Sequence, residues 1–235
     1  MAKSPSNIFM LERNLKVLGL SVSGVFEIPF ELCPQGQGAL AGKPAVMIGN
    51  FGGAMWEALR VSPEFSDGLP NPMNRWTERE MTALARDLGA HSIFPFDKPY
   101  WPFQRLAHLA TGIQPSPLGL MIHPEFGLWQ ALRSVLIFES DAEIVSQFNA
   151  LEGELNNLIH PCDSCEDKPC LTACPVGAFT GEELKVDRCF GHLDSDADPK
   201  CMTLGCRARD ACPVGVEHRY DNEQVQFHMR SYRGV

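Results

Sequence analysis

The sequence predicts an α+β protein in two parts, a larger domain of mixed helices and strands followed by a small cysteine-rich module. Three observations predict this class. The 235 residues are 44% hydrophobic, which is ample for a real core. Helical and strand-like patterns alternate up to about residue 140, and eight of the nine cysteines lie between Cys162 and Cys212. We therefore expect domains over residues 1–140 and 159–235, joined by a polar linker over 141–158.

Two helical segments are predicted in the larger domain, over residues 8–18 and 77–88. In both, apolar side chains recur at helical spacing on one face, and a glycine follows the last of them. Thr77 and Glu80 have the spacing of a capping box, which favours a helix that begins at Thr77.

The strand-like segments of this domain are 22–28, 45–48, 92–94, 118–122 and 129–138. We expect the last two to pair with each other, because the residues between them have a turn-forming composition. The glycine-rich stretch 49–53 follows a strand and precedes a probable helix, but it matches no nucleotide-binding motif. A tight strand-to-helix turn is its simplest interpretation, and a close approach to a ligand is the alternative.

Charge and composition exclude several classes. The formal net charge of −9 argues against non-specific binding to nucleic acid or to an anionic membrane, since both need a basic surface. No stretch approaches the roughly 20 apolar residues of a membrane span, and the first residues lack the apolar core of a secretory signal. We expect a cytoplasmic protein with no nucleic-acid or membrane partner. In a reducing compartment, clustered cysteines favour metal over disulfides.

The strongest motif is the run from Cys162 to Pro175, with the spacing C-x2-C-x4-C-x3-C-P. The bacterial ferredoxin run has the same form with two fewer residues in its middle gap. Further cysteines follow, and both runs end in Cys-Pro-Val-Gly, at Cys174 and at Cys212, as in a degenerate duplication. This pattern predicts a bacterial-type module that binds two 4Fe–4S clusters.

The eight cysteines fill eight ligand places with none left over. One cluster would take Cys162, Cys165, Cys170 and Cys212, and the other would take Cys174, Cys189, Cys201 and Cys206. Two all-cysteine zinc sites would use the same number of ligands and are the structural alternative. Cys33 is then a spare thiol, and we expect the histidines near the clusters to be surface or packing residues, namely His160, His192 and His218.

A second motif, I-H-P-x-F-G-x-W-x-A-[IL]-R, ends at Arg133 and resembles the signature of the cblC-type cobalamin-processing family of decyanases and dealkylases. The resemblance implies a nitroreductase-like sandwich domain that binds a corrinoid. Gly119 and Gly127 would let a flat macrocycle approach, and Trp129 would offer a ring face. His123 would be a polar group or cobalt-side ligand, and Arg133 would pair with a carbonyl, phosphate or carboxylate. Taken singly, these residues also suit turns, cores and ion pairs.

The cysteine module resembles that of epoxyqueuosine reductase, which joins a cobalamin-binding domain to a two-cluster ferredoxin domain. Cys174-Pro-Val-Gly-Ala178 and the separated Cys189 carry this resemblance. The chain departs from the cblC-type family of animals, since the arginines that bind glutathione there have no counterpart here. Electron delivery through the clusters is the natural substitute for a thiol.

Together these motifs predict an oxidoreductase in which two clusters pass single electrons to the cobalt of bound cobalamin. A reductase, a flavodoxin or a ferredoxin would supply the electrons. One alternative is a reductase of a small organic substrate with cobalamin as cofactor, for which Glu125, Asp97 and Glu139 are the candidate carboxylates. The other is an electron carrier without enzyme activity, whose first domain docks a partner.

Overall fold

The computed structural model describes residues 7–139, 159–197 and 200–235. The chain forms two compact units, each considered separately below. The first comprises Met1–Gly112 and Ala131–Leu158, and the second comprises Ile113–Gln130 and Ile159–Val235. The segment 113–130, predicted as part of the larger domain, thus packs with the cysteine-rich part of the chain. The predicted linker over 141–158 lies outside the described residues.

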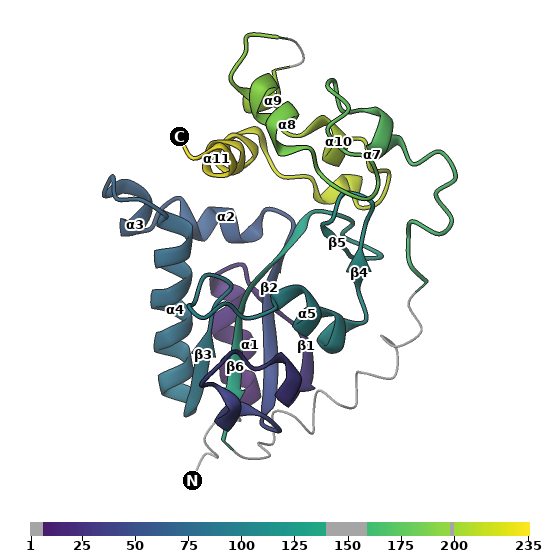
Figure 1. The fold of residues 1–235 in the computed structure, drawn as a ribbon. Helices are drawn as coiled ribbons and strands as arrows, with labels where there is room; N and C mark the ends of the chain where they lie inside the picture. Colours follow the sequence, from purple (N-terminus) through teal and green to yellow (C-terminus); the bar gives the residue numbers. More distant parts are fainter. Residues whose placement is uncertain (1–6, 140–158, 198–199) are drawn as a thin grey trace. The chain divides into compact units, whose positions relative to one another are not determined.

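The first unit is built on a four-stranded sheet in the order β1-β2-β6-β3 (Figure 1). The strands are β1 (Ser21–Glu27), β2 (Pro44–Phe51), β3 (Ala90–Ile93) and β6 (Gln130–Phe138). β1 pairs antiparallel with β2, and β3 pairs antiparallel with β6. The six central residues of β2 are all buried, as are the last five of β6, so the two inner strands carry much of the core. Strands that are buried on both faces have continuous apolar sequences, and β2 confirms the strand predicted over 45–48.

Helices pack against this sheet. They are α1 (Asn7–Val17), α2 (Ala54–Leu59), α3 (Pro63–Ser66), α4 (Pro72–Leu88) and α5 (Phe103–Thr111), with short 3-10 turns η1 (Phe30–Leu32) and η2 (Gly38–Leu40). α1 contacts β1, α4 contacts β3, and α5 contacts β1 and β2. Leu11 and Leu15 of α1 are fully buried, which confirms the predicted apolar face of the first helix. The glycine-rich stretch forms a strand-to-helix turn between β2 and α2.

Two expectations about this part of the chain are wrong. The helix predicted from Thr77 begins five residues earlier, at Pro72, because proline suits the first helical position and buried Met73 and Trp76 extend the apolar face backward. Thr77 is therefore a buried interior residue and not a cap.

Segments 118–122 and 129–138 do not pair with each other. Only Met121–Ile122 of the first segment forms a strand, β5, and it pairs with β4 (Gln114–Pro115). The second segment becomes β6 and pairs with β3. The turn between the segments closes on itself, since His123 and Gly127 exchange two backbone hydrogen bonds of 2.9 Å, and this separates the flanking strands.

The second unit is made of the small β4–β5 sheet and short helices. These are α7 (Pro169–Thr172), α8 (Val186–Leu193), α9 (Cys201–Leu204), α10 (Arg207–Asp210), η4 (Val216–His218) and α11 (Asn222–Arg233). Helices of four residues are not stable alone, so packing must hold them. Two buried groups do this, one around Leu118, Ile122 and Leu128 with Cys170 and Cys212, the other around Leu193, Met229 and Cys201. Cysteines contribute to both cores.

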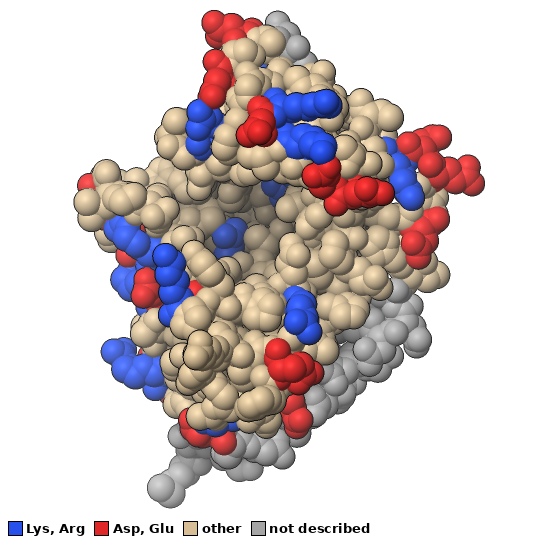
Figure 2. Space-filling model, viewed as in Figure 1, with Lys and Arg blue, Asp and Glu red and all other residues tan. Residues whose placement is uncertain are grey.

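Charged side chains are mixed on the face of the molecule drawn in Figure 2, where lysines and arginines lie among aspartates and glutamates. Ion pairs among the described residues include Arg75 with Asp67 and Arg233 with Asp194. None of the helices in the described ranges is long and apolar enough to span a bilayer.

An ion pair between the buried carboxylate of Glu64 and the exposed side chain of Arg79 predicts that the stability of the first unit depends on acid. The hydrogen bond that Arg79 donates to Glu64, 2.6 Å between Nε and Oε1, lowers the pKa of Glu64 from 4.5 to about 2. Because the folded pKa is depressed, the stabilisation is present above about pH 4.5 and is lost as the pH falls toward 2. We expect Glu64→Gln to cost about 2 kcal/mol at pH 7, and this cost to shrink as the pH falls to 2.5. Urea unfolding of both proteins across this range measures it, and a pH-independent difference would contradict it.

Candidate functional site

The four cysteines predicted to bind one cluster lie around a single hollow in the second unit. Cys162, Cys165, Cys170 and Cys212 line one hollow of about 20 Å³, with Ile122 and Leu128 in its wall. Lys168 has a left-handed backbone, with φ of 38°, and it turns the chain into α7, which carries Cys170. Cys212 follows α10, so a residue distant in sequence completes the set.

The other four predicted ligands line a second hollow of about 240 Å³. Cys174 follows α7, Cys189 lies on α8, Cys201 begins α9, and Cys206 precedes α10. The wall between them is apolar, with contributions from Leu118, Phe179, Leu184, Leu193 and Met229. The structure therefore groups the cysteines as two sets of four. We call them the Cys170 set (Cys162, Cys165, Cys170, Cys212) and the Cys206 set (Cys174, Cys189, Cys201, Cys206).

The electrostatics of the thiols follow the same division. Burial, together with the neighbouring thiols of Cys212, Cys170 and Cys165, raises the pKa of Cys162 to about 11. Burial also raises the pKa of Cys189, with contributions from other members of the Cys206 set. Thiols that stay protonated at neutral pH must release protons when they bind metal. Across the described residues, no three His, Cys, Asp or Glu side chains are arranged to hold a metal ion.

Backbone N–H groups hydrogen-bond to several of these thiols, Cys174 and Cys206 among them. Burial raises the pKa of Cys206, while the backbone N–H groups of Arg209 and Ala208 hydrogen-bond to it and act in the opposite direction. Both donors lie on α10, immediately after the cysteine. Hydrogen bonds of this kind favour the charged thiolate that a metal requires.

Four of the five predicted corrinoid contacts lie in the second unit, and two of them form the same turn. The Nδ1 atom of His123 accepts the backbone N–H groups of Glu125 and Phe126, at 3.1 and 3.2 Å. Burial lowers the pKa of His123, which favours the neutral ring whose Nδ1 accepts these bonds. Gly127 has φ of +56°, and a β-carbon there would overlap the carbonyl oxygen of Val214. The close approach predicted for a macrocycle is thus made by the loop that follows Cys212.

The remaining predicted contacts differ in their surroundings. Gly119 has φ of +75° and open space beside it. Trp129 is 3% exposed and packs edge-on against Tyr220, with 5.3 Å between ring centroids. Arg133 belongs to the first unit, where its Nε donates to Asn50 Oδ1 at 2.8 Å and its Nη1 lies 2.8 Å from Met73 Sδ. No described contact brings these five residues together as one site.

Cys33 and the three histidines near the cysteine module have structural surroundings. The Cys33 thiol donates to the Pro29 carbonyl at 3.5 Å, and burial raises its pKa. His160 accepts the backbone N–H of Cys162, and His218 packs on Phe126, with 4.5 Å between ring centroids. His192 is buried and lines the hollow of the Cys206 set.

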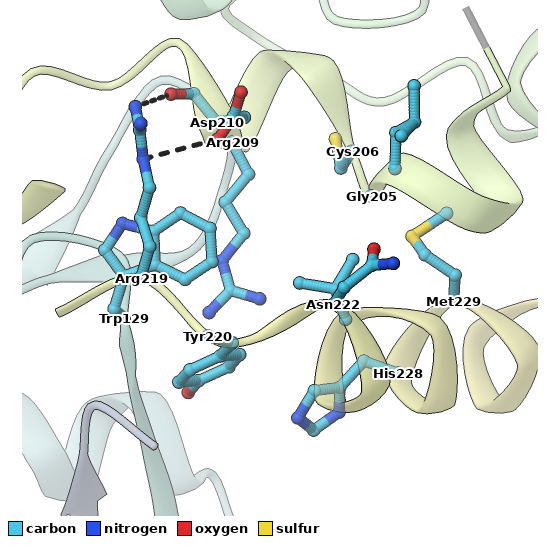
Figure 3. Close-up of a pocket in the computed structure, with 12 residues that line it drawn as sticks. Trp129, Gly205, Cys206, Arg209, Asp210, Arg219, Tyr220, Asn222, His228 and Met229 are labelled. Carbon is cyan, nitrogen blue, oxygen red and sulfur yellow. Dashed lines mark hydrogen bonds and ion pairs between the residues drawn. The ribbon is translucent and has the colours of Figure 1, made fainter.

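A pocket beside Cys206 holds residues that the sequence did not single out. It has a volume of about 200 Å³, and Figure 3 shows the guanidinium of Arg209 beside the indole of Trp129 and above the ring of Tyr220. Arg219 faces Asp210 across the same pocket, with 3.3 Å between Nε and Oδ1. Nothing in the sequence pairs Arg209 with Trp129, because the two residues are 80 positions apart.

The fold belongs to a class of mixed α+β proteins, and solved members of that class include a vitamin B12 trafficking protein and a reductase. At 16% identity, the chain superimposes on the Caenorhabditis elegans B12-trafficking protein CblC, a homologue of human MMACHC, with a TM-score of 0.53 over 95% of this chain and 90% of that one. The identity is low, so this likeness establishes the fold alone. No family model matches the chain, and no curated protein does.

The second kind of neighbour is epoxyqueuosine reductase. A structure bound to an epoxyqueuosine-modified tRNA-Tyr stem loop matches with a TM-score of 0.50 and 14% identity, over 91% of this chain. The enzyme from Streptococcus thermophilus matches with a TM-score of 0.50 and 13% identity, over 88%. This chain covers 66% and 65% of those longer proteins.

Proposed function

We propose that the chain is an iron–sulfur reductase that binds two 4Fe–4S clusters and delivers their electrons to a bound cobalamin. The observation that carries the proposal is the separation of eight cysteines into two sets of four, each around its own hollow. The hollow of the Cys206 set has room for a group much larger than a single ion. The hollow of the Cys170 set is narrower, so its thiols must move apart to seat a cluster.

The residues around the proposed clusters suit electron transfer more than bond chemistry at the metal. All-cysteine ligation leaves no open position on iron, and the clusters would supply single electrons. Apolar walls limit water, and backbone N–H groups directed at Cys206 would stabilise its thiolate. The chain itself therefore orients ligands and controls their charge.

Cobalamin is the proposed substrate. One electron converts cobalt(III) to cobalt(II), and an upper ligand such as cyanide then leaves with its electron pair. The fold shared with a B12-trafficking protein supports this proposal, as does the signature that ends at Arg133. Gly119, His123, Trp129 and Arg133 remain its proposed contacts, whereas the space beside Gly127 is filled by the Val214 carbonyl.

A second function, reduction of a small organic substrate with cobalamin as cofactor, is favoured by the match to epoxyqueuosine reductase, which extends over both units. This chemistry needs a carboxylate as proton donor. Asp97 accepts the backbone N–H of Phe94 at 2.7 Å, and Glu139 pairs with Lys43 at 2.8 Å, so both have structural partners. Glu125 is exposed and is the remaining candidate. Turnover of an organic acceptor with unchanged cobalamin would favour this function.

Anaerobic titration with cyano-, methyl- and hydroxocobalamin tests corrinoid binding and reduction. We expect the reconstituted protein to shift the absorption spectrum of the corrinoid and, once reduced by dithionite that is then removed, to convert cobalt(III) to cobalt(II). The double variant Cys170→Ala/Cys206→Ala is the control, since it should bind the corrinoid without reducing it. Absence of any spectral shift with all three corrinoids would contradict the proposal. Cluster reduction with no corrinoid affinity would instead indicate an electron carrier.

A further inference from the structure

Arg209 supplies a positive charge to the wall of the Cys206 set. Its side chain lines the hollow that contains the four thiols and also the neighbouring pocket beside Cys206. It lies on α10, three residues after Cys206 and three before Cys212. It does not line the hollow of the Cys170 set. Its charge is therefore placed toward one of the two sets.

Three groups hold this guanidinium in place. Its Nη2 donates to the Leu128 carbonyl at 2.6 Å, while its central carbon lies 4.4 Å from the Trp129 ring and 4.7 Å from the Tyr220 ring. Stacking on two aromatic rings is a favourable environment for arginine and leaves its charge intact. Trp129 and Tyr220 are both buried, so the rings are fixed supports.

The charge of Arg209 is not offset by a carboxylate among the described residues. Its neighbours differ in this respect, since Arg207 pairs with Asp210 at 3.0 Å and Arg219 pairs with the same aspartate at 3.3 Å. The contacts of Arg209 are one carbonyl and two rings. An unpaired cation beside four cysteines is a counter-charge for an anionic group bound by those cysteines.

We infer that Arg209 raises the reduction potential of the cluster held by the Cys206 set, and that Trp129 and Tyr220 position it for this. The inference rests on the proposed function. Reduction adds one negative charge to a cluster, so a fixed cation nearby favours the reduced form. The two clusters would then differ in potential, and electrons would collect on the one beside Arg209.

The test is a redox titration of the reconstituted full-length protein, followed by electron paramagnetic resonance. In Arg209→Gln, we expect the reduced-to-oxidised ratio of one cluster to fall about tenfold at a fixed potential, a shift of about 59 mV for a one-electron couple, with the other cluster unchanged. Arg230→Gln is the matched control, since Arg230 is an exposed cation on α11 that lines neither hollow. Equal potentials in Arg209→Gln and the wild type would overturn the inference.

A variant that keeps the charge guards against misfolding of Arg209→Gln. Arg209→Lys retains a cation at this position but loses the planar group that stacks on the two rings, so its potential should stay nearer to the wild-type value than that of Arg209→Gln. Equal shifts in Arg209→Lys and Arg209→Gln would also overturn the inference. Iron content separates the two claims, because a wild-type protein without iron refutes the proposed function, whereas full iron content with unmoved potentials refutes only the role of Arg209.

Discussion

Alanine at Cys206 is expected to remove about half of the iron from the anaerobically reconstituted protein, because the Cys206 set then lacks one of its four ligands. Alanine at Cys170 should have the same effect through the other set. Cys33→Ala is the matched control, since this thiol lies in the first unit and belongs to neither set, and it should retain all of the iron. Iron and acid-labile sulfide per chain are the measurements.

Double variants test which cysteines share a cluster. Cys170 and Cys174 are four residues apart but belong to different sets, whereas Cys170 and Cys212 are 42 residues apart and belong to the same set. We therefore expect Cys170→Ala/Cys174→Ala to lose nearly all of the iron. Cys170→Ala/Cys212→Ala should lose no more than Cys170→Ala alone. The reverse order would show that the sets are partitioned wrongly.

Gly127→Ala is expected to be among the most destabilising substitutions in the second unit. The residue has φ of +56°, which disfavours any β-carbon, and the added methyl group would overlap the Val214 carbonyl oxygen. The loop that must move follows Cys212 directly. We expect a loss of about 3 kcal/mol in the free energy of unfolding, measured by urea titration.

Gly119→Ala provides the control for backbone strain alone. Gly119 has a similar φ of +75°, but nothing lies within 4 Å of the added carbon, so the expected loss is only about 1 kcal/mol. Similar losses for the two variants would mean that the contact between the 123–127 turn and the Val214 loop contributes little.

In the first unit, the sequence predicted those elements whose apolar residues recur at helical or strand spacing and are buried. The apolar run of β2 and the stop of α1 at Gly19 are both as expected, because each depends on neighbouring residues. The start of α4 was missed because Asn71 enters the helix from a left-handed conformation and Pro72 follows, a signal weaker than the apparent capping box at Thr77. The predicted pairing of 118–122 with 129–138 was wrong because pairing depends on the backbone conformation of the intervening turn, which the sequence does not specify.

The candidate site shows the same limit. Ligand spacing predicts two sets of four cysteines, and each set lines its own hollow, but the binding of a cluster by either set stays a prediction. The close contact between Gly127 and the Val214 carbonyl could not be predicted, because the two residues are 87 positions apart in the sequence. Arg209 was missed likewise, since its importance comes from Trp129 and Tyr220, which are brought to it only by folding.

The most direct test of the central claim is elemental analysis of the wild-type protein, purified anaerobically and reconstituted with iron and sulfide. Two four-cysteine clusters predict about eight iron atoms and eight sulfides per chain, one full complement for each set. Two zinc ions per chain, with no iron and no sulfide, would contradict the proposal and assign the eight cysteines to structural metal sites.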